Sequence, residues 1–246
     1  MNKTKPIYAT GIFLIVILTV AVTVLSILLF KNDKTEELSD MEKYYNAKCE
    51  SYKTQNFNLS KGQIVFVGDS ITDLCPLDDY YSDLPLATYN RGIGGDRTEG
   101  VLRRLDCSVF DIEPSCVVLL IGTNDINFGI ENEKTIENYE KIINTIKEKL
   151  PNTKLYCVSI IPQGRLIEGT IPTTLAENTE TIMKINSQIK SLCEKEQKAC
   201  YVDIFSSLAD ENNILIDTYT DDGLHLNANG FSVWSEIMLP LLKETK

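Results

Sequence analysis

Residues 64–70 read Ile-Val-Phe-Val-Gly-Asp-Ser, and this stretch decides how the rest of the chain is interpreted. Four apolar residues, mostly β-branched, run directly into Gly-Asp-Ser, which is typical of a fully buried strand that ends in a tight turn. A serine in that place stands at the carboxyl end of a strand, where open α/β sheets bind their ligands. Ser70 is therefore the first candidate for a reactive side chain.

Similar apolar runs recur along the chain and alternate with segments of helical periodicity. We expect strands at residues 64–67, 87–89, 115–121, 155–161 and 201–204. We expect helices in the lead-in before residue 60, just after residue 96, and around residues 136–150, 182–192 and 231–241. Strands separated by such helices predict right-handed βαβ units and a parallel sheet covered on both faces. The predicted fold class is α/β, a three-layer α/β/α sandwich with a five-stranded parallel sheet.

Two details of these helices can be tested against a structure. Asp96 and Glu99 have the spacing of a capping box, which predicts that a short helix begins at Asp96. Pro240 lies inside the last helical pattern, so we expect it to bend or shorten that helix.

The N-terminal region is apolar in a different way. Residues 7–30 carry no charge, and as a helix at about 1.5 Å per residue they would reach about 36 Å. That length crosses a hydrocarbon core of ~30 Å with some tilt. The run is longer than the ~7–15 apolar residues of a cleaved signal peptide, and it ends in Leu-Leu-Phe-Lys without small residues. We therefore favour an uncleaved transmembrane anchor over a cleaved signal peptide.

The charges that flank this span predict its orientation and the domain plan. Lys3 and Lys5 precede it, whereas Lys31 and Lys34 follow it among acidic residues. This bias favours a cytoplasmic N-terminus and an extracellular C-terminal part, in a single-pass protein of the cell membrane. The expected plan is a cytoplasmic tail at 1–6, a transmembrane signal anchor at 7–30, a polar stalk with a lead-in helix at 31–60, and the α/β domain at 61–246.

Net charge and cysteine content restrict the partners. The chain has 24 basic and 35 acidic residues, a formal net charge of −11. Nucleic-acid binding needs clustered Lys and Arg, so this acidic chain is not expected to bind nucleic acid. The seven cysteines include no CxxC pair and no spacing suited to zinc. Cys116 and Cys157 fall in apolar runs and are expected in the core, while Cys193 and Cys200 are candidates for a disulfide across a turn.

Four short polar segments stand at or just beyond expected strand ends. They are Gly-Asp-Ser at 68–70, Asn-Arg-Gly-Ile-Gly-Gly-Asp at 90–96, Gly-Thr-Asn-Asp at 122–125 and Asp-Gly-Leu-His at 222–225. Each by itself is more typical of an ordinary turn or surface pair. The glycine-rich segment lacks both the Lys-Ser/Thr of a P-loop and the G-x-G-x-x-G spacing.

Together the four segments meet the needs of acyl transfer. A serine is a weak nucleophile until a base takes its proton, and His225 is the only histidine of the chain. Asp222 can hold the imidazole in the correct tautomer. The backbone N–H groups of Ser70 and Gly95 and the side-chain amide of Asn124 are candidate donors to an oxyanion.

The order of these residues resembles the SGNH (or GDSL) hydrolases. That family is named for Ser, Gly, Asn and His in four successive blocks, which correspond here to Ser70, Gly95, Asn124 and Asp222 with His225. The resemblance covers about residues 62–242 and is greatest to the branch of platelet-activating-factor acetylhydrolase subunits and bacterial acyl esterases. It implies a flavodoxin-like sheet, an exposed Ser-His-Asp triad, and neither metal nor cofactor.

Several other polar or aromatic residues receive structural interpretations. Asp69 and Asp125 are expected to cap helices or brace turns, and Trp234 is expected in the core. Arg91 and Arg165 are interpreted as solvated loop arginines rather than substrate contacts.

The predicted function is a membrane-anchored extracellular serine esterase that hydrolyses small acyl esters. O-acetyl groups on carbohydrate are the leading substrate hypothesis, based on the expected location. A lysophospholipase or thioesterase, an O-acyltransferase acting on cell-wall glycans, and a catalytically silent binding domain remain open as alternatives. The oligomeric state is not predicted.

Overall fold

The computed structural model describes residues 38–166, 172, 174–196 and 199–245. The expected transmembrane span at 7–30 lies outside these residues. Within the described ranges, no helix combines the length and apolar character needed to cross a membrane. The chain divides into two compact units, Met1–Lys43 and Tyr44–Lys246, and the second unit contains the whole sheet.

The core of the second unit is a five-stranded parallel sheet with the strand order β2-β1-β3-β4-β5. The strands are β1 (Ile64–Gly68), β2 (Thr88–Gly92), β3 (Cys116–Leu120), β4 (Lys154–Val158) and β5 (Cys200–Val202). All five expected strands are present, with ends shifted by a few residues. The first strand lies in the interior of the sheet, so the segment that follows it opens at the middle of the carboxyl edge.

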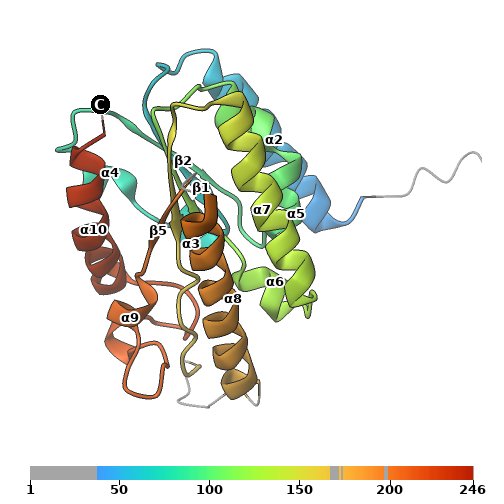
Figure 1. The fold of residues 1–246 in the computed structure, drawn as a ribbon, viewed down its shortest axis with the longest axis vertical. Coiled ribbons are helices and arrows are strands. Elements are labelled where there is room, and N and C mark those ends of the chain that lie inside the picture. Colours follow the sequence, from blue (N-terminus) through green and yellow to red (C-terminus); the bar gives the residue numbers. More distant parts are fainter. Residues whose placement is uncertain (1–37, 167–171, 173, 197–198, 246) are drawn as a thin grey trace, which may run out of the picture. The chain divides into compact units, whose positions relative to one another are not determined.

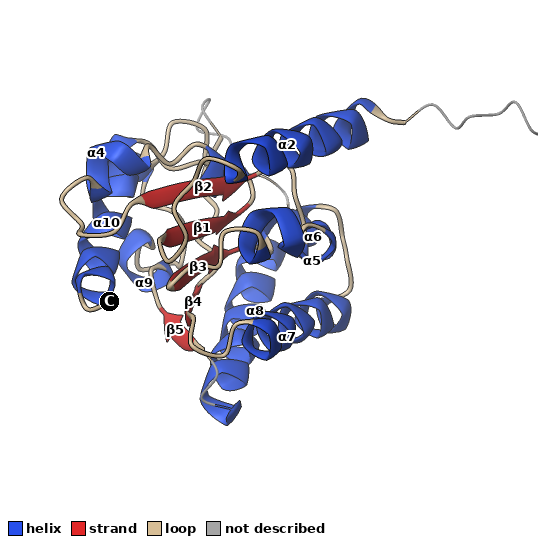
Figure 2. Ribbon diagram, turned by 90° about the horizontal axis from the view of Figure 1, so that it is seen from above, coloured by secondary structure: helices blue, strands red, loops and turns tan. Residues whose placement is uncertain are grey.

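Helices cover both faces of the sheet, as the end-on view in Figure 2 shows. On one face lie α4 (Leu77–Tyr81), α9 (Phe205–Leu208) and α10 (Ala228–Lys243), whereas α5 (Thr98–Arg103), α7 (Asn132–Lys149) and α8 (Leu175–Glu196) lie on the other (Figure 1). The remaining helical segments are α2 (Asp40–Asn56), α3 (Ser70–Asp73), α6 (Thr123–Asn127), a π-helical turn (Asp106–Phe110) and a 3₁₀ turn (Asp217–Tyr219). The three-layer α/β/α prediction is confirmed.

Two apolar clusters hold the layers together, one on each side of the sheet. Side chains along β1 alternate between them, with Ile64 and Phe66 in the first cluster and Val65 and Val67 in the second. This alternation follows from the two-residue period of a strand that is buried on both faces. Trp234 of α10 is fully buried in the first cluster, as expected from the sequence.

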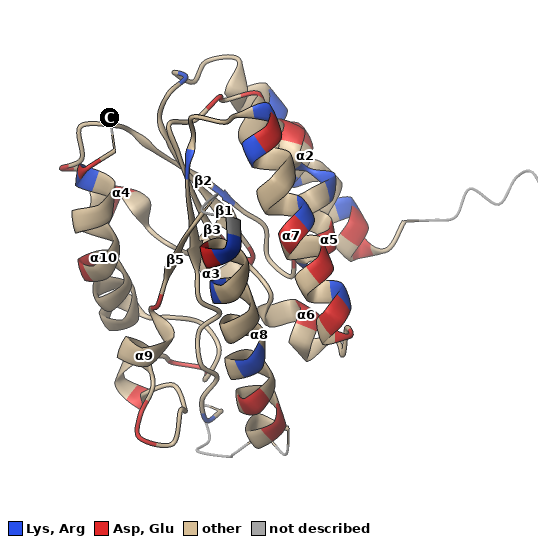
Figure 3. Ribbon diagram, in the orientation of Figure 1, with Lys and Arg blue, Asp and Glu red and all other residues tan. Residues whose placement is uncertain are grey.

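The solvent side of the helices carries charges of both signs. Figure 3 shows acidic and basic residues intermixed along α7. Glu137 of this helix pairs with both Lys134 and Lys141, one turn before and one turn after it. Exposed pairs of this kind contribute little because water and salt screen them, so the apolar clusters rather than these ions stabilise the layers.

Two expectations for local structure were wrong. The capping box is absent because α5 begins at Thr98 with Arg97 as its N-cap, and the carboxylate of Asp96 faces a buried arginine instead. Arg91 is not a solvated loop residue, since it lies in β2 and is buried. Pro240 lies inside α10 and does not end it, since the helix continues to Lys243, and the expected bend stays a prediction.

The cysteines also differ from the disulfide expectation. All seven are free thiols. Cys193 contacts Cys157 of β4 through a side-chain hydrogen bond instead of pairing with Cys200. The reason is that α8 turns Cys193 toward the core, whereas Cys200 is exposed at the start of the edge strand β5.

Helix α3 packs so closely on β2 that only a glycine fits at the contact. A Cβ atom added to Gly92 would lie 2.1 Å from the backbone nitrogen of Asp73 and 2.5 Å from its Cα atom. Those atoms belong to the backbone and cannot move aside without shifting the whole helix. The contact therefore sets the position of α3, whose first residue is Ser70.

Asp69 caps this helix and is fully buried. Its carboxylate oxygen Oδ1 accepts a hydrogen bond of 3.0 Å from the backbone N–H of Ile71, while Oδ2 has no hydrogen-bond partner among the described residues. Burial raises the pKa of Asp69 to about 7, because the desolvated carboxylate outweighs that one hydrogen bond.

We expect Gly92→Ala to destabilise the fold by at least about 3 kcal/mol, because the methyl group meets backbone. Gly129→Ala is the control: Gly129 has a φ of +67° but no atom within 4 Å, so the substitution should cost only the left-handed strain of about 1–2 kcal/mol. Urea unfolding measures both values. Equal losses in the two variants would show that the contact of α3 with β2 is not tight.

We expect the stability of Asp69→Asn, relative to the unsubstituted protein, to rise with pH. The folded-state pKa of Asp69 lies above its unfolded value of ~3.9, so the stabilising contribution of the protonated form is complete below pH ~4 and is lost as the pH rises through about 7. Asparagine can keep the bond to Ile71 without ionising. The free energy of unfolding of both proteins is measured between pH 4 and 8. The difference, variant minus unsubstituted protein, should increase by roughly 1–4 kcal/mol over this range. A difference that does not change with pH would contradict the raised pKa.

Candidate active site

Ser70 stands at the carboxyl end of β1, as the sequence predicted. The strand ends at Gly68, Asp69 is the N-cap of α3, and Ser70 is the first residue of that helix. Gly68 permits close packing at this point, since a Cβ atom there would lie 2.2 Å from the carbonyl oxygen of Leu120 and 2.2 Å from the hydroxyl oxygen of Thr72 in α3. The serine hydroxyl is therefore presented at the sheet edge by two rigid elements, not by a mobile loop.

His225 is held by a loop that is organised around Asp222. The carboxylate oxygen Oδ1 of Asp222 accepts hydrogen bonds from the backbone N–H groups of Leu224, at 2.8 Å, and His225, at 2.7 Å. Gly223 has a φ of +83° and lies against the backbone of Arg165. The Asp-Gly-Leu-His segment is thus a tight turn whose aspartate fixes the backbone that carries the histidine.

Three side chains from the two ends of the domain form one hydrogen-bonded row. His225 Nε2 lies 2.9 Å from Ser70 Oγ, and His225 Nδ1 lies 2.6 Å from Asp222 Oδ2. Because the carboxylate can only accept at neutral pH, Nδ1 carries the proton and Nε2 is free to accept the serine proton. The structure therefore brings together the serine, histidine and aspartate that the sequence singled out.

The electrostatics of Asp222 favour its charged form. Partial burial by itself would raise the pKa of Asp222, but hydrogen bonds from the His225 side chain and from the backbone N–H groups of His225 and Leu224 hold it below its ordinary value. The carboxylate is thus ionised over the whole neutral range. An ionised partner at Nδ1 stabilises an imidazolium when the ring accepts a proton at Nε2.

Gly95 lies on the connection from β2 to α5, and Asn124 lies in the first turn of α6 beside it. The carbonyl oxygen of Ile93 accepts from the N–H of Asp96 at 3.1 Å, and Gly95 inside this turn has a φ of +75°. The turn's own hydrogen bond does not use the N–H of Gly95. Asn124 Nδ2 donates to the carbonyl oxygen of Asp96 at 2.9 Å, which ties the amide of Asn124 to the same turn.

A buried arginine that the sequence analysis did not single out braces these connections. Arg104 Nε lies 2.7 Å from Asp96 Oδ2, and both side chains are almost fully buried. Its guanidinium also donates to the carbonyl oxygens of Gly68, at 2.9 Å, and Arg91, at 2.8 Å. An arginine directly after a short helix resembles a surface residue in the sequence, so no local signal marked it.

Asp125 has the bracing role expected of it. Its carboxylate accepts from the backbone N–H of Thr98 at 3.0 Å and from the hydroxyl of the same residue at 2.5 Å. This pair joins the first turn of α6, which carries Asn124, to the first turn of α5. Arg165, by contrast, is exposed and pairs with Asp217, as expected for a solvated arginine.

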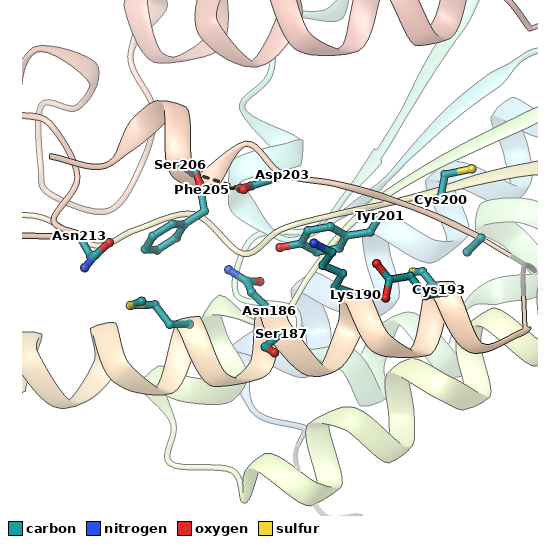
Figure 4. Close-up of a pocket in the computed structure, with 13 residues that line it drawn as sticks. Asn186, Ser187, Lys190, Cys193, Cys200, Tyr201, Asp203, Phe205, Ser206 and Asn213 are labelled. Carbon is teal, nitrogen blue, oxygen red and sulfur yellow. Dashed lines mark hydrogen bonds between the residues drawn. The ribbon is translucent and has the colours of Figure 1, made fainter. Parts of the chain in front are cut away.

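A cavity of about 940 Å³ lies elsewhere, between α8 and β5 (Figure 4). Ser206 in its lining donates a hydrogen bond of 2.7 Å to Asp203, as the dashed line in Figure 4 shows. The lining contains no histidine, and the only histidine of the chain belongs to the Ser70 row. Ser206 therefore has no imidazole that could activate it as a nucleophile. Among the described residues, no three His, Cys, Asp or Glu side chains converge as metal ligands.

Comparison with known proteins shows what the chain is similar to. Human platelet-activating factor acetylhydrolase IB subunit alpha1 is 27% identical over 173 residues, which cover 69% of this chain and 71% of that protein. The mouse alpha2 subunit is 28% identical over 189 residues, or 74% of this chain and 78% of that protein.

Solved structures share the fold. A protein from Streptococcus pneumoniae, provisionally assigned as a platelet activating factor, superimposes with a TM-score of 0.75 and 26% identity, covering 89% of this chain and 99% of that one. A GDSL-like lipase from Bacteroides thetaiotaomicron gives a TM-score of 0.71 at 21% identity, covering 82% of this chain and 100% of that one. Residues 66–233 match the GDSL-like Lipase/Acylhydrolase family. The resemblance seen in the sequence is confirmed, and the chain belongs to the GDSL-like lipase/acylhydrolase family.

Proposed function

We propose that this protein is a serine esterase that hydrolyses small acyl esters through an acyl-enzyme, with Ser70 as nucleophile, His225 as general base and acid, and Asp222 as its orienting carboxylate. One observation carries the proposal: the continuous row from Ser70 Oγ to His225 Nε2, at 2.9 Å, and from His225 Nδ1 to Asp222 Oδ2, at 2.6 Å. Membership of an acylhydrolase family supports the same reaction class.

The geometry suggests the order of the proposed steps. Ser70 Oγ attacks the ester carbonyl carbon while its proton passes to His225 Nε2. The carbonyl oxygen becomes an oxyanion, for which the N–H groups of Ser70 and Gly95 and the amide of Asn124 are the proposed donors. The protonated His225 then gives its proton to the departing alcohol, which leaves an ester on Ser70. Water attacks that ester while His225 takes its proton, and His225 then returns this proton to Ser70 Oγ as the acid is released.

Small acyl groups, with acetyl first, are the proposed substrates. Relatives that are 27–28% identical are named acetylhydrolases, which supports a short acyl chain. We further propose O-acetylated carbohydrate outside the cell as the substrate class and a membrane anchor at residues 7–30, on the strength of the apolar run and its flanking charges. A lysophospholipid or thioester substrate, or transfer of the acyl group to a glycan hydroxyl, would use the same Ser70 chemistry.

We expect Ser70→Ala to reduce hydrolysis of p-nitrophenyl acetate by the full-length protein by at least about 10⁴-fold, because only the oxyanion donors and substrate binding would remain. The substitution removes one hydroxyl from a half-buried position and should leave thermal unfolding nearly unchanged. Acetate, butyrate and octanoate esters are compared at pH 5–9. Full turnover by the folded variant would contradict the mechanism.

We expect Asp222→Asn to lower kcat by about 10²–10⁴-fold, because an amide at this position no longer stabilises the imidazolium or fixes the Nδ1–H tautomer. Since the pKa of Asp222 lies below its ordinary value, this loss should persist undiminished from pH 6 to pH 9. Asp217→Asn is the matched control, as Asp217 is an exposed aspartate on the neighbouring 3₁₀ turn. A similar loss in both variants would indicate a general electrostatic effect in place of a specific one.

A further inference from the structure

One aromatic side chain from outside the four motifs stands beside the nucleophile. Tyr44 of α2 donates a hydrogen bond of 3.0 Å from its hydroxyl to Asp73 Oδ2. Asp73 is the last residue of α3, the helix that Ser70 begins. Lys48, one turn further along α2, binds the other oxygen of the same carboxylate at 2.7 Å. The phenol ring is thereby held in one orientation against the nucleophile helix.

Gly94 separates this ring from Ser70 and leaves a gap between them. A Cβ atom added to Gly94 would lie 3.6 Å from Tyr44 Oη, 3.8 Å from Tyr44 Cε1 and 4.0 Å from Ser70 Cβ. All three values are ordinary van der Waals distances, so a single methyl group would touch the tyrosine and the serine at once. The backbone of Gly94 is therefore the floor of a narrow gap whose two walls are Tyr44 and Ser70.

The topology determines which part of an ester would point into this gap. The loop that carries His225 is tied to the segment after β4 by a hydrogen bond of 2.7 Å from Gly164 N–H to the Gly223 carbonyl oxygen. Gly94 follows β2, which lies on the opposite side of β1 from β4. Since His225 gives its proton to the leaving alcohol, the alcohol departs on the β4 side. The acyl chain then extends toward the β2 side, where Gly94 and Tyr44 lie.

We propose that Tyr44 is a specificity-determining residue that closes the acyl side of the site and restricts this protein to short acyl chains. The inference rests on the proposed esterase function and specifies which acyl group it accepts. About 41% of Tyr44 remains exposed, so its side chain is accessible to a substrate. The wall comes from the lead-in helix, which precedes the residues that match the family.

If Tyr44 only anchored α2, its loss would have the same effect as the loss of another anchoring residue of that helix. Tyr45 is such a residue and serves as the control. Tyr45 also joins α2 to the domain, with its hydroxyl donating to the Gly100 carbonyl oxygen at 2.8 Å and its ring 4.6 Å from the Arg103 guanidinium. These contacts anchor α2 to α5 and do not involve Gly94 or Ser70. Loss of the Tyr45 ring therefore loosens α2 without opening the gap.

The test measures kcat/KM of the full-length protein for p-nitrophenyl butyrate and acetate and takes the ratio of the two. Tyr44→Ala should raise this ratio about tenfold or more, because a pocket that excludes one or two methylenes discriminates by about 10–200-fold. Tyr44→Phe keeps the ring and should stay within about threefold of the unsubstituted ratio. Tyr45→Ala should also leave the butyrate-to-acetate ratio within about threefold of the unsubstituted value, even if it lowers thermal stability.

A variant that adds bulk tests the same gap in the opposite direction and does not depend on removing a contact. Gly94→Ala places a methyl group between Tyr44 and Ser70 and should lower the butyrate-to-acetate ratio by about threefold or more. An unchanged ratio in folded Tyr44→Ala and Gly94→Ala would overturn the inference, as would equal ratio changes in Tyr44→Ala and Tyr45→Ala. If the unsubstituted protein shows no Ser70-dependent turnover of any ester, the proposed function itself fails, which is a distinct result.

Discussion

One buried guanidinium joins the chain segments that carry the site. Arg104 pairs with Asp96 and also donates to the carbonyl oxygens of Gly68 and Arg91 and to the hydroxyl of Ser108. It thus joins the end of β1, the end of β2 and the turn that carries the proposed oxyanion donor. Removing one partner from a buried pair leaves an uncompensated charge and costs about 3–5 kcal/mol. Because a guanidinium directs its donors in a fixed planar fork, these chain ends are held at set distances from one another.

The other groups proposed for the reaction lie in the first turns of helices or in a hydrogen-bonded turn. Ser70 begins a helix whose position is set by the glycine contact with β2, and Asn124 lies in the first turn of α6. His225 lies in a turn that its own neighbour Asp222 organises. Pre-organisation of this kind matters for acyl transfer, because donors that are already oriented need no rearrangement when charge develops on the oxyanion. The lead-in helix adds Tyr44 to this arrangement from a part of the chain that carries none of the four motifs.

Much of the fold could be predicted because buried parallel strands are continuous apolar runs, and β1 and β3 are of this kind. The second strand was underestimated, since Asn90 and Arg91 are polar. They are accommodated because β2 is an edge strand on which α2 packs, with Asn56 accepting from the Arg91 guanidinium at 2.9 Å. Asp96 was misassigned as a helix cap for a similar reason: its partner Arg104 lies eight residues away and is recognisable only when both are buried.

The sequence by itself determined the order of strands and helices along the chain and the family. It also singled out Ser70, Asp222 and His225 as candidate catalytic residues, because they lie in local motifs and the chain has a single histidine. Tertiary structure alone decided that Ser70 and His225, 155 residues apart, lie within hydrogen-bonding distance. It also decided that Arg104 is buried and that Tyr44 binds Asp73, in the helix that Ser70 begins. Such contacts join segments distant in the chain, and their partners are chosen by the packing of α2, α5 and the sheet, which no local pattern of residues encodes.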